Sequence, residues 1–178
     1  MGYKTWRSIE MTLDPKSIKQ ALKEIEECKK QLVEALSDLA KQLTEQGAQI
    51  AKMQIASMEA VDTGELEHSV RGQYNAKEHI GYIRAGEGLT YAFYVEYGTG
   101  PVGESNQHPE PEKVGWEYNV GETIGINEKH PEWGEGWWYP GDDGRAHWTA
   151  GQPARPFMYN TFIWLEEAVQ ALGRNIFT

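Results

Sequence analysis

The stretch DPKSIKQALKEIEECKKQLVEALSDLAKQLTEQGAQIAKMQIASMEA, residues 14–60, decides the fold. Its apolar residues recur at steps of four and three, and only Lys29 and Gln46 interrupt the series. On an α-helix this spacing gathers the apolar side chains into one narrow stripe, with Glu, Lys and Gln around the rest. The stripe consists of Ile18, Leu22, Ile25, Leu32, Leu36, Leu39, Leu43, Ile50 and Met53.

Asp14 and Pro15 are typical of the cap and the first residue of a helix, because proline loses nothing where the backbone N–H has no partner. We therefore predict a helix over residues 15–60, on the order of 65 Å long at 1.5 Å per residue, with a bend or break at Gly47. Two interpretations of its stripe stay open. The stripe packs on the protein's own sheet, or it also contacts a neighbouring subunit.

Three short β-strands are predicted after this helix, over residues 70–74, 79–85 and 90–97. The turn residues between them, 75–77 and 86–88, are expected to form hairpin connections. Alternation is clearest in the third strand, where one side is predicted to carry Tyr91, Phe93, Val95 and Tyr97 and the other Ala92, Tyr94 and Glu96.

The composition changes at Gly98. From there to Gly151 the chain holds eleven of its nineteen glycines and five of its seven tryptophans. This composition predicts an elaborated loop or a small β excursion and argues against a helix. A helical pattern returns after it, with Pro156 expected at the helix start and Gly173 expected to cap its end.

These elements predict an α+β fold: a long N-terminal helix, an antiparallel β meander with a Gly/Trp-rich insertion, and a short C-terminal helix packed on the sheet. A length of 178 residues favours a single domain, residues 1–178. Its expected segments are the long helix (15–60), the meander (61–100), the aromatic-rich insertion (101–152) and the C-terminal helix region (153–178).

The charge and the apolar pattern exclude several classes of protein. The chain has 17 Lys and Arg against 27 Asp and Glu, a net charge of −10. Proteins that grip nucleic acid cluster basic side chains against the phosphates, so DNA binding is not expected. No run approaches the roughly 18 apolar residues of a membrane helix, and the N-terminus lacks a signal-peptide pattern. A single cysteine, Cys28, excludes an internal disulfide.

No constellation for catalysis is recognisable. The histidines show no His-x-x-x-His pair, and no cysteine pair is present to complete a zinc site. A Gly-x-Ser-x-Gly elbow and a phosphate-binding Gly-x-x-x-x-Gly-Lys-Ser/Thr run are also missing from the sequence. We therefore predict no catalytic residue, no cofactor and no metal. The histidines are His68, His79, His108, His130 and His147.

The insertion gathers aromatic residues, and three interpretations of them are ordered by preference. They serve as interface anchors or as the core of the loop. Alternatively they form a carbohydrate-binding surface, and least favoured is glycan hydrolysis by the neighbouring carboxylates. The aromatic residues are Trp133, Trp137, Trp138, Tyr139 and Trp148, and the acidic ones are Glu132, Glu135, Asp142 and Asp143.

Three separated motifs occur in a characteristic order. They are DTGELEHSV (62–70), YAFYVEYGTG (91–100) and GQPARPFM (151–158). In this order the chain resembles the neck and tail-completion proteins of long-tailed bacteriophages. The long insertion between the second and third motifs is a departure from that pattern. The motif residues to which the resemblance gives a structural role are Thr63, Gly64, Leu66, Ser69, Glu96, Gly98, Thr99, Gly100, Pro153, Pro156 and Phe157.

The resemblance implies a non-enzymatic virion protein at the head–tail junction, made in the host bacterial cytoplasm. It would act by binding other connector and tail proteins as a homo-oligomeric ring, without a membrane and without sequence-specific nucleic acid binding. On this interpretation, truncating Trp137 or Trp138 to alanine weakens assembly and leaves the monomer folded. Glu96 is expected to pair with Arg155 or Arg84, or to accept backbone N–H bonds.

Overall fold

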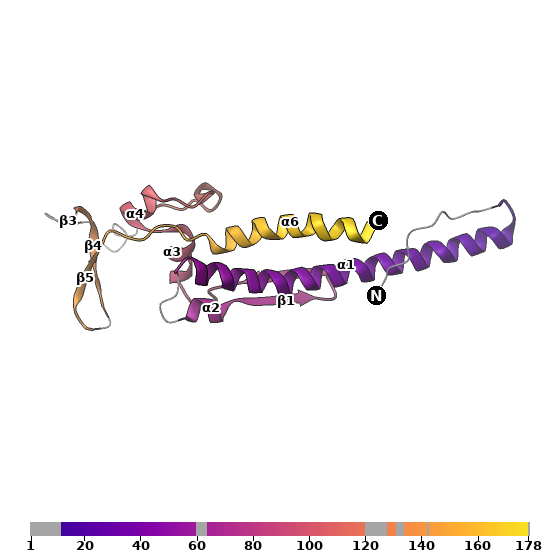
Figure 1. The fold of residues 1–178 in the computed structure, drawn as a ribbon, viewed down its shortest axis with the longest axis horizontal. Helices are drawn as coiled ribbons and strands as arrows, with labels where there is room; N and C mark the ends of the chain where they lie inside the picture. Colours follow the sequence, from indigo (N-terminus) through magenta and orange to yellow (C-terminus); the bar gives the residue numbers. More distant parts are fainter. Residues whose placement is uncertain (1–11, 60–63, 120–127, 131–133, 142, 178) are drawn as a thin grey trace. The chain divides into compact units, whose positions relative to one another are not determined.

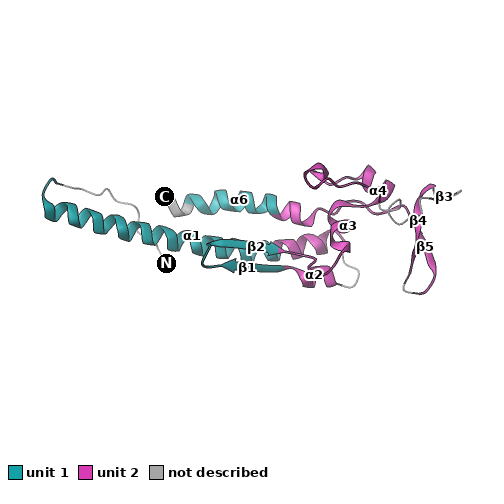
Figure 2. Ribbon diagram, turned by 180° about the vertical axis from the view of Figure 1, so that it is seen from behind, with its two compact units in different colours: residues 1–49, 71–83, 162–178 teal, residues 50–70, 84–161 magenta. Residues whose placement is uncertain are grey.

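The computed structural model describes residues 12–59, 64–119, 128–130, 134–141 and 143–177 (Figure 1). The predicted α+β fold is confirmed. The chain divides into two compact units, each built from separated segments (Figure 2), while the single-domain organisation stays a prediction. Unit 1 comprises Met1–Gln49, Arg71–Ile83 and Phe162–Thr178, and unit 2 comprises Ile50–Val70 and Arg84–Thr161.

Helix α1 (Pro15–Ser57) begins where the sequence predicts and ends three residues before the expected Ala60. The side chain of Asp14 caps it, because Asp14 Oδ1 accepts the N–H groups of Lys16 at 2.9 Å and of Ser17 at 3.0 Å. These N–H groups have no partner within a helix, so the cap stabilises the first turn.

Strands β1 (Arg71–Asn75) and β2 (Ile80–Arg84) form a two-stranded sheet, which confirms the first two predicted strands. The four residues between them form the predicted turn. Asn75 Oδ1 accepts the N–H of Lys77 at 3.0 Å, a local bond that favours chain reversal.

Glycines let the hairpin lie directly on α1 within unit 1. A Cβ atom at Gly72 would lie 2.8 Å from the carbonyl oxygen of Thr44, and one at Gly81 would collide with Thr44 Oγ1. Helix α1 continues unbroken through Gly47, so the expected break there is wrong. Ile83 of β2 and Leu165 both pack against Gly47, where a Cβ would collide with Ile83 Cδ1 and lie 3.2 Å from Leu165 Cδ2.

The third predicted strand is wrong, because residues Tyr91–Tyr97 form helix α3. Its buried residues are Ala92, Val95 and Glu96, a spacing of three and one that a helix face accommodates. In a strand, the neighbours Val95 and Glu96 would point to opposite faces. The expected hairpin connection at residues 86–88 is likewise a turn into this helix, with Leu89 N–H donating to Gly86 O at 2.8 Å.

The described residues of the insertion form two short helical segments and a small sheet, all within unit 2. The helical segments are α4 (Gly100–Ser105) and the 3-10 turn η1 (Pro111–Val114). The sheet is antiparallel with strand order β3-β4-β5, which confirms the predicted β excursion. Its strands are β3 (Glu128–His130), β4 (Gly134–Pro140) and β5 (Ala146–Thr149).

Helix α6 (Phe157–Phe177) starts directly after Pro156, as predicted. It continues past Gly173, so the expected cap at that glycine is wrong. A Cβ at Gly173 would meet nothing within 4 Å, so no tertiary contact forces the chain to leave the helix there. Among the described helices, none combines the length and apolar character that crossing a membrane requires.

Candidate protein interface and the buried site at Glu96

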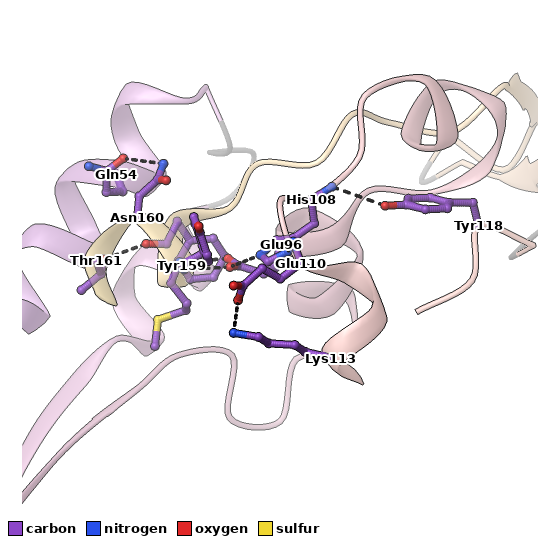
Figure 3. A network of polar contacts seen from close by, with 11 residues as sticks. Gln54, Glu96, His108, Glu110, Lys113, Tyr118, Tyr159, Asn160 and Thr161 are labelled. Atoms are coloured by element: carbon purple, nitrogen blue, oxygen red, sulfur yellow. Dashed lines mark hydrogen bonds and ion pairs between the residues drawn. The ribbon is translucent and has the colours of Figure 1, made fainter. Parts of the chain in front are cut away.

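Glu96 of α3 is buried, with 7% of its surface exposed, and its carboxylate caps helix α6 (Figure 3). Its Oε2 accepts the N–H of Met158 and its Oε1 that of Tyr159, both at 2.9 Å. The residue before the helix is Pro156, whose side chain offers no acceptor. A side chain from a distant part of the sequence therefore satisfies N–H groups that would otherwise stay unbonded.

His108 closes the other side of Glu96. It is 4% exposed, and its Nε2 lies 3.3 Å from Glu96 Oε1. Its Nδ1 accepts the N–H of Glu110 at 3.0 Å, so the ring proton sits on Nε2 and points at the carboxylate. Tyr97 and Tyr159 pack on the imidazole, with ring centroids 4.4 and 5.2 Å away.

The balance of burial and hydrogen bonds sets the pKa of Glu96. Burial, the largest cause, raises this pKa, and the N–H groups of Met158 and Tyr159 and the proximity of His108 lower it. Burial dominates, so the pKa of Glu96 lies above its ordinary value of 4.5. The carboxyl group therefore holds its proton more tightly in the folded chain than in the unfolded one.

This raised pKa predicts a pH dependence of stability with a defined sign. Between the ordinary and the raised pKa the folded state binds more protons, so the contribution of Glu96 to the free energy of unfolding falls as pH rises through that window. Urea denaturation of the wild type and of Glu96→Gln, between about pH 4 and pH 8, measures this. The difference between the two is expected to change across the window, and parallel curves would contradict the prediction.

The expected partners of Glu96 are partly confirmed. It accepts backbone N–H bonds, as predicted, but its side-chain partner is His108 and not an arginine. Arg155 instead donates through Nε to Met58 O at 3.1 Å and through a terminal nitrogen to Gln152 Oε1 at 3.0 Å. The sequence did not indicate His108 as the partner, because twelve positions and the short helix α4 separate it from Glu96.

The second and third sequence motifs meet in space. Thr99 N–H donates to Gln152 O at 2.9 Å, and Gln152 N–H donates to Thr99 O at 3.1 Å. Gly98 adopts φ 79°, and a Cβ there would lie 2.7 Å from the backbone nitrogen of Ala154. This pair of bonds joins the two ends of the insertion, so the insertion leaves and re-enters the fold at one place.

The remaining motif residues serve the fold within unit 2. Gly64 has φ 80° before α2 (Glu65–Ser69), and Leu66 is 2% exposed. Ser69 Oγ donates to Leu66 O at 2.6 Å and accepts the N–H of Gly86 at 2.7 Å. Phe157 is also 2% exposed, directly after the half-buried Pro156. Thr63 lies outside the described residues; Pro153, like Pro156, is half-buried.

The aromatic residues of the insertion divide between the two faces of the β4–β5 pair. Trp138 lies opposite Trp148 across the strands, and their rings meet edge to face, with centroids 5.5 Å apart. On the other face Trp137 is buried, and its ring occupies the space that a Cβ at Gly100 would need. Tyr139 is 44% exposed beside His147. Trp133 lies outside the described residues.

The interpretation of the insertion as a carbohydrate-binding or glycan-hydrolysing surface stays a hypothesis. Of its acidic residues, Glu132 and Asp142 lie outside the described residues. Asp143 is bonded to His147, with Oδ1 2.9 Å from Nε2, and this bond lowers the pKa of Asp143. Among the residues that the structure describes, no group of three or more His, Cys, Asp or Glu side chains is placed to hold a metal ion.

The stripe of α1 divides into two parts. Its C-terminal part packs on the protein itself as far as Ile50, since Leu39, Leu43 and Ile50 are half-buried, whereas Met53 is 64% exposed. Its N-terminal part stays largely exposed, with exposed fractions of 37% for Ile18, 57% for Leu22, 51% for Ile25 and 43% for Leu36. Exposed apolar side chains in one row are typical of a surface that binds another protein.

The comparisons with known proteins agree with the motifs. Residues 18–98, a little under half of the chain, match the family model described as "Bacteriophage HK97-gp10, putative tail-component". The matched segment contains the first motif, the second motif as far as Gly98, and the exposed part of α1. No curated protein and no solved structure matches the chain. The segment from Ile18 to Gly98 is therefore similar to the HK97-gp10-like family of phage tail components.

Proposed function

We propose that this chain is a structural protein of the phage head–tail junction, a neck or tail-completion protein that acts by binding. The family match supports a tail component over residues 18–98. The observation that carries the finer proposal is the pairing of Thr99 with Gln152, together with the cap that Glu96 provides for α6. These contacts join the third motif, outside the matched segment, to the second, so these two motifs form one structural unit.

The protein works in a homo-oligomeric ring within the virion and binds neighbouring connector and tail proteins. Its surfaces for these contacts are the exposed part of α1 and the aromatic sheet of the insertion, where Trp138, Tyr139 and Trp148 are only partly buried. Aromatic side chains contribute much of the free energy of protein interfaces. Binding is the whole mechanism in this proposal, with no bond made or broken and no cofactor.

A phage that carries a stop codon in this gene tests the proposal. Electron microscopy of its lysates is expected to show full heads and separate finished tails that have not joined, with few infectious particles. A wild-type copy of the gene supplied on a plasmid is the control and should restore joined particles. Normal infectious particles without the protein would refute the proposal. Heads without any tails would place the protein earlier, in tail assembly.

A further inference from the structure

The exposed part of α1 extends beyond the elements that pack on this helix in unit 1 (Figure 2). The turn of the hairpin reaches only Ser37, whose Oγ lies 2.8 Å from Nδ1 of His79. Helix α6 runs antiparallel beside α1 and passes Gly47 at Leu165. It ends twelve residues later at Phe177, level with about Ala35, since both helices rise about 1.5 Å per residue. Within the described part of the chain, no other helix or strand reaches Ile18, Leu22 and Ile25, which stay exposed although the smaller Ala21 beside them is buried.

A second exposed apolar row lies on α6, also within unit 1. Phe162 is 55% exposed and Val169 is 47% exposed. Positions 162, 166 and 169 fall on one side of the helix, because they are separated by four and three residues. Glu166, which is exposed, therefore lies between the two apolar side chains.

The two rows have the same spacing and opposite charges. On α1, Lys29 stands four residues after Ile25 and three before Leu32. On α6, Glu166 stands four residues after Phe162 and three before Val169. Each row is thus apolar, charged, apolar, with a lysine at the centre of one and a glutamate at the centre of the other.

Both central charges lack an ion-pair partner within the described part of the chain. Other lysines of α1 do have one on their own helix, as Lys23 pairs with Glu27 and Lys30 with Glu34, each at 3.9 Å. Those pairs lie away from the stripe. A lysine inside an apolar row hinders burial of that row unless a carboxylate meets it there.

We propose that residues 18–36 of one copy bind the exposed row of α6 on a second copy of this chain, with Lys29 paired to Glu166 at the centre. Two stripes of α1 would pair less well with each other, because the stripe holds a lysine and no acidic residue. The contact joins two different surfaces, so each copy binds one neighbour at each surface, and the chain of copies closes into a ring when the rotation allows. The inference rests on the proposed ring and names the surfaces that form it.

Charge exchange tests the contact in the purified full-length protein. The wild type is expected to sediment as an oligomer. Lys29→Glu and Glu166→Lys should each weaken association at least about tenfold, because each leaves two like charges facing each other. The double variant should restore association. Lys30→Glu and Glu167→Lys make the same charge changes one residue outside the two rows, and should leave association unchanged.

Disulfide trapping provides a second measurement that does not depend on affinity. With Cys28→Ser as background, oxidation of the Lys29→Cys, Glu166→Cys double variant should give a ladder of covalent oligomers, and neither single variant should do so. Dimers from Lys29→Cys alone would show that α1 binds α1 and would overturn the inference. The inference would also be overturned if the wild type sedimented as a monomer, or if the charge variants associated as strongly as the wild type. The proposed function would survive these results if the stop-codon phage still left heads and tails unjoined.

Discussion

Replacing Glu96 with alanine is expected to lower the free energy of unfolding by about 3–5 kcal/mol, because three donors lose their acceptor. The variant leaves the N–H groups of Met158 and Tyr159 without their acceptor at the start of α6. It also leaves the Nε2 proton of the buried His108 without the carboxylate oxygen that it faces. Each buried donor that loses its partner costs about 1–3 kcal/mol. Chemical denaturation at neutral pH, followed by tryptophan fluorescence, measures the loss.

Glu96→Gln separates the hydrogen bonds of this side chain from its charge. Glutamine keeps one carbonyl oxygen as an acceptor and avoids the burial of a charge, which raises the pKa of the wild-type carboxyl. We therefore expect Glu96→Gln to lose less than half as much stability as Glu96→Ala. If the free energy of unfolding of Glu96→Ala lies within about 1 kcal/mol of the wild-type value, the carboxylate of Glu96 does not hold α6 to α3.

The sequence predicted the elements whose pattern is local and repeated. Helix α1 repeats its apolar spacing over many turns and starts at an Asp-Pro cap, so both its type and its first residue were predictable. The first hairpin was marked by turn residues after Asn75. In both cases the residues that determine the structure are neighbours along the chain.

Helix α3 could not be predicted in the same way. Its sequence places Tyr91, Phe93, Val95 and Tyr97 at alternate positions, a pattern typical of a strand. A helix of only seven residues also has little stability of its own. Tertiary contacts decide the outcome, because Glu96 and Val95 must both be buried and Glu96 must reach the start of α6. The partner His108 comes from the glycine-rich insertion, where no period marks which side chains turn inward.

Replacing Trp137 with alanine is expected to destabilise unit 2 by about 3–5 kcal/mol, the usual cost of truncating a buried tryptophan. The sequence favoured this residue as an interface anchor whose truncation leaves the monomer folded. Its burial changes that expectation. Trp137 is 7% exposed and packs against Gly100, the last residue of the second motif. Its truncation would therefore open a cavity where the insertion meets that motif. Denaturation of the purified variant measures the effect.

Tyr139→Ala is the matched control, because Tyr139 lies two residues further on the same strand and face but is 44% exposed. Its truncation should change stability by no more than about 0.5 kcal/mol and should reduce the yield of joined phage particles. Trp138→Ala should fall between the two, since it removes an aromatic pair worth about 0.5–1.5 kcal/mol beyond its burial. If Trp137→Ala keeps full stability and only assembly fails, Trp137 contacts a partner protein and does not belong to the core of unit 2.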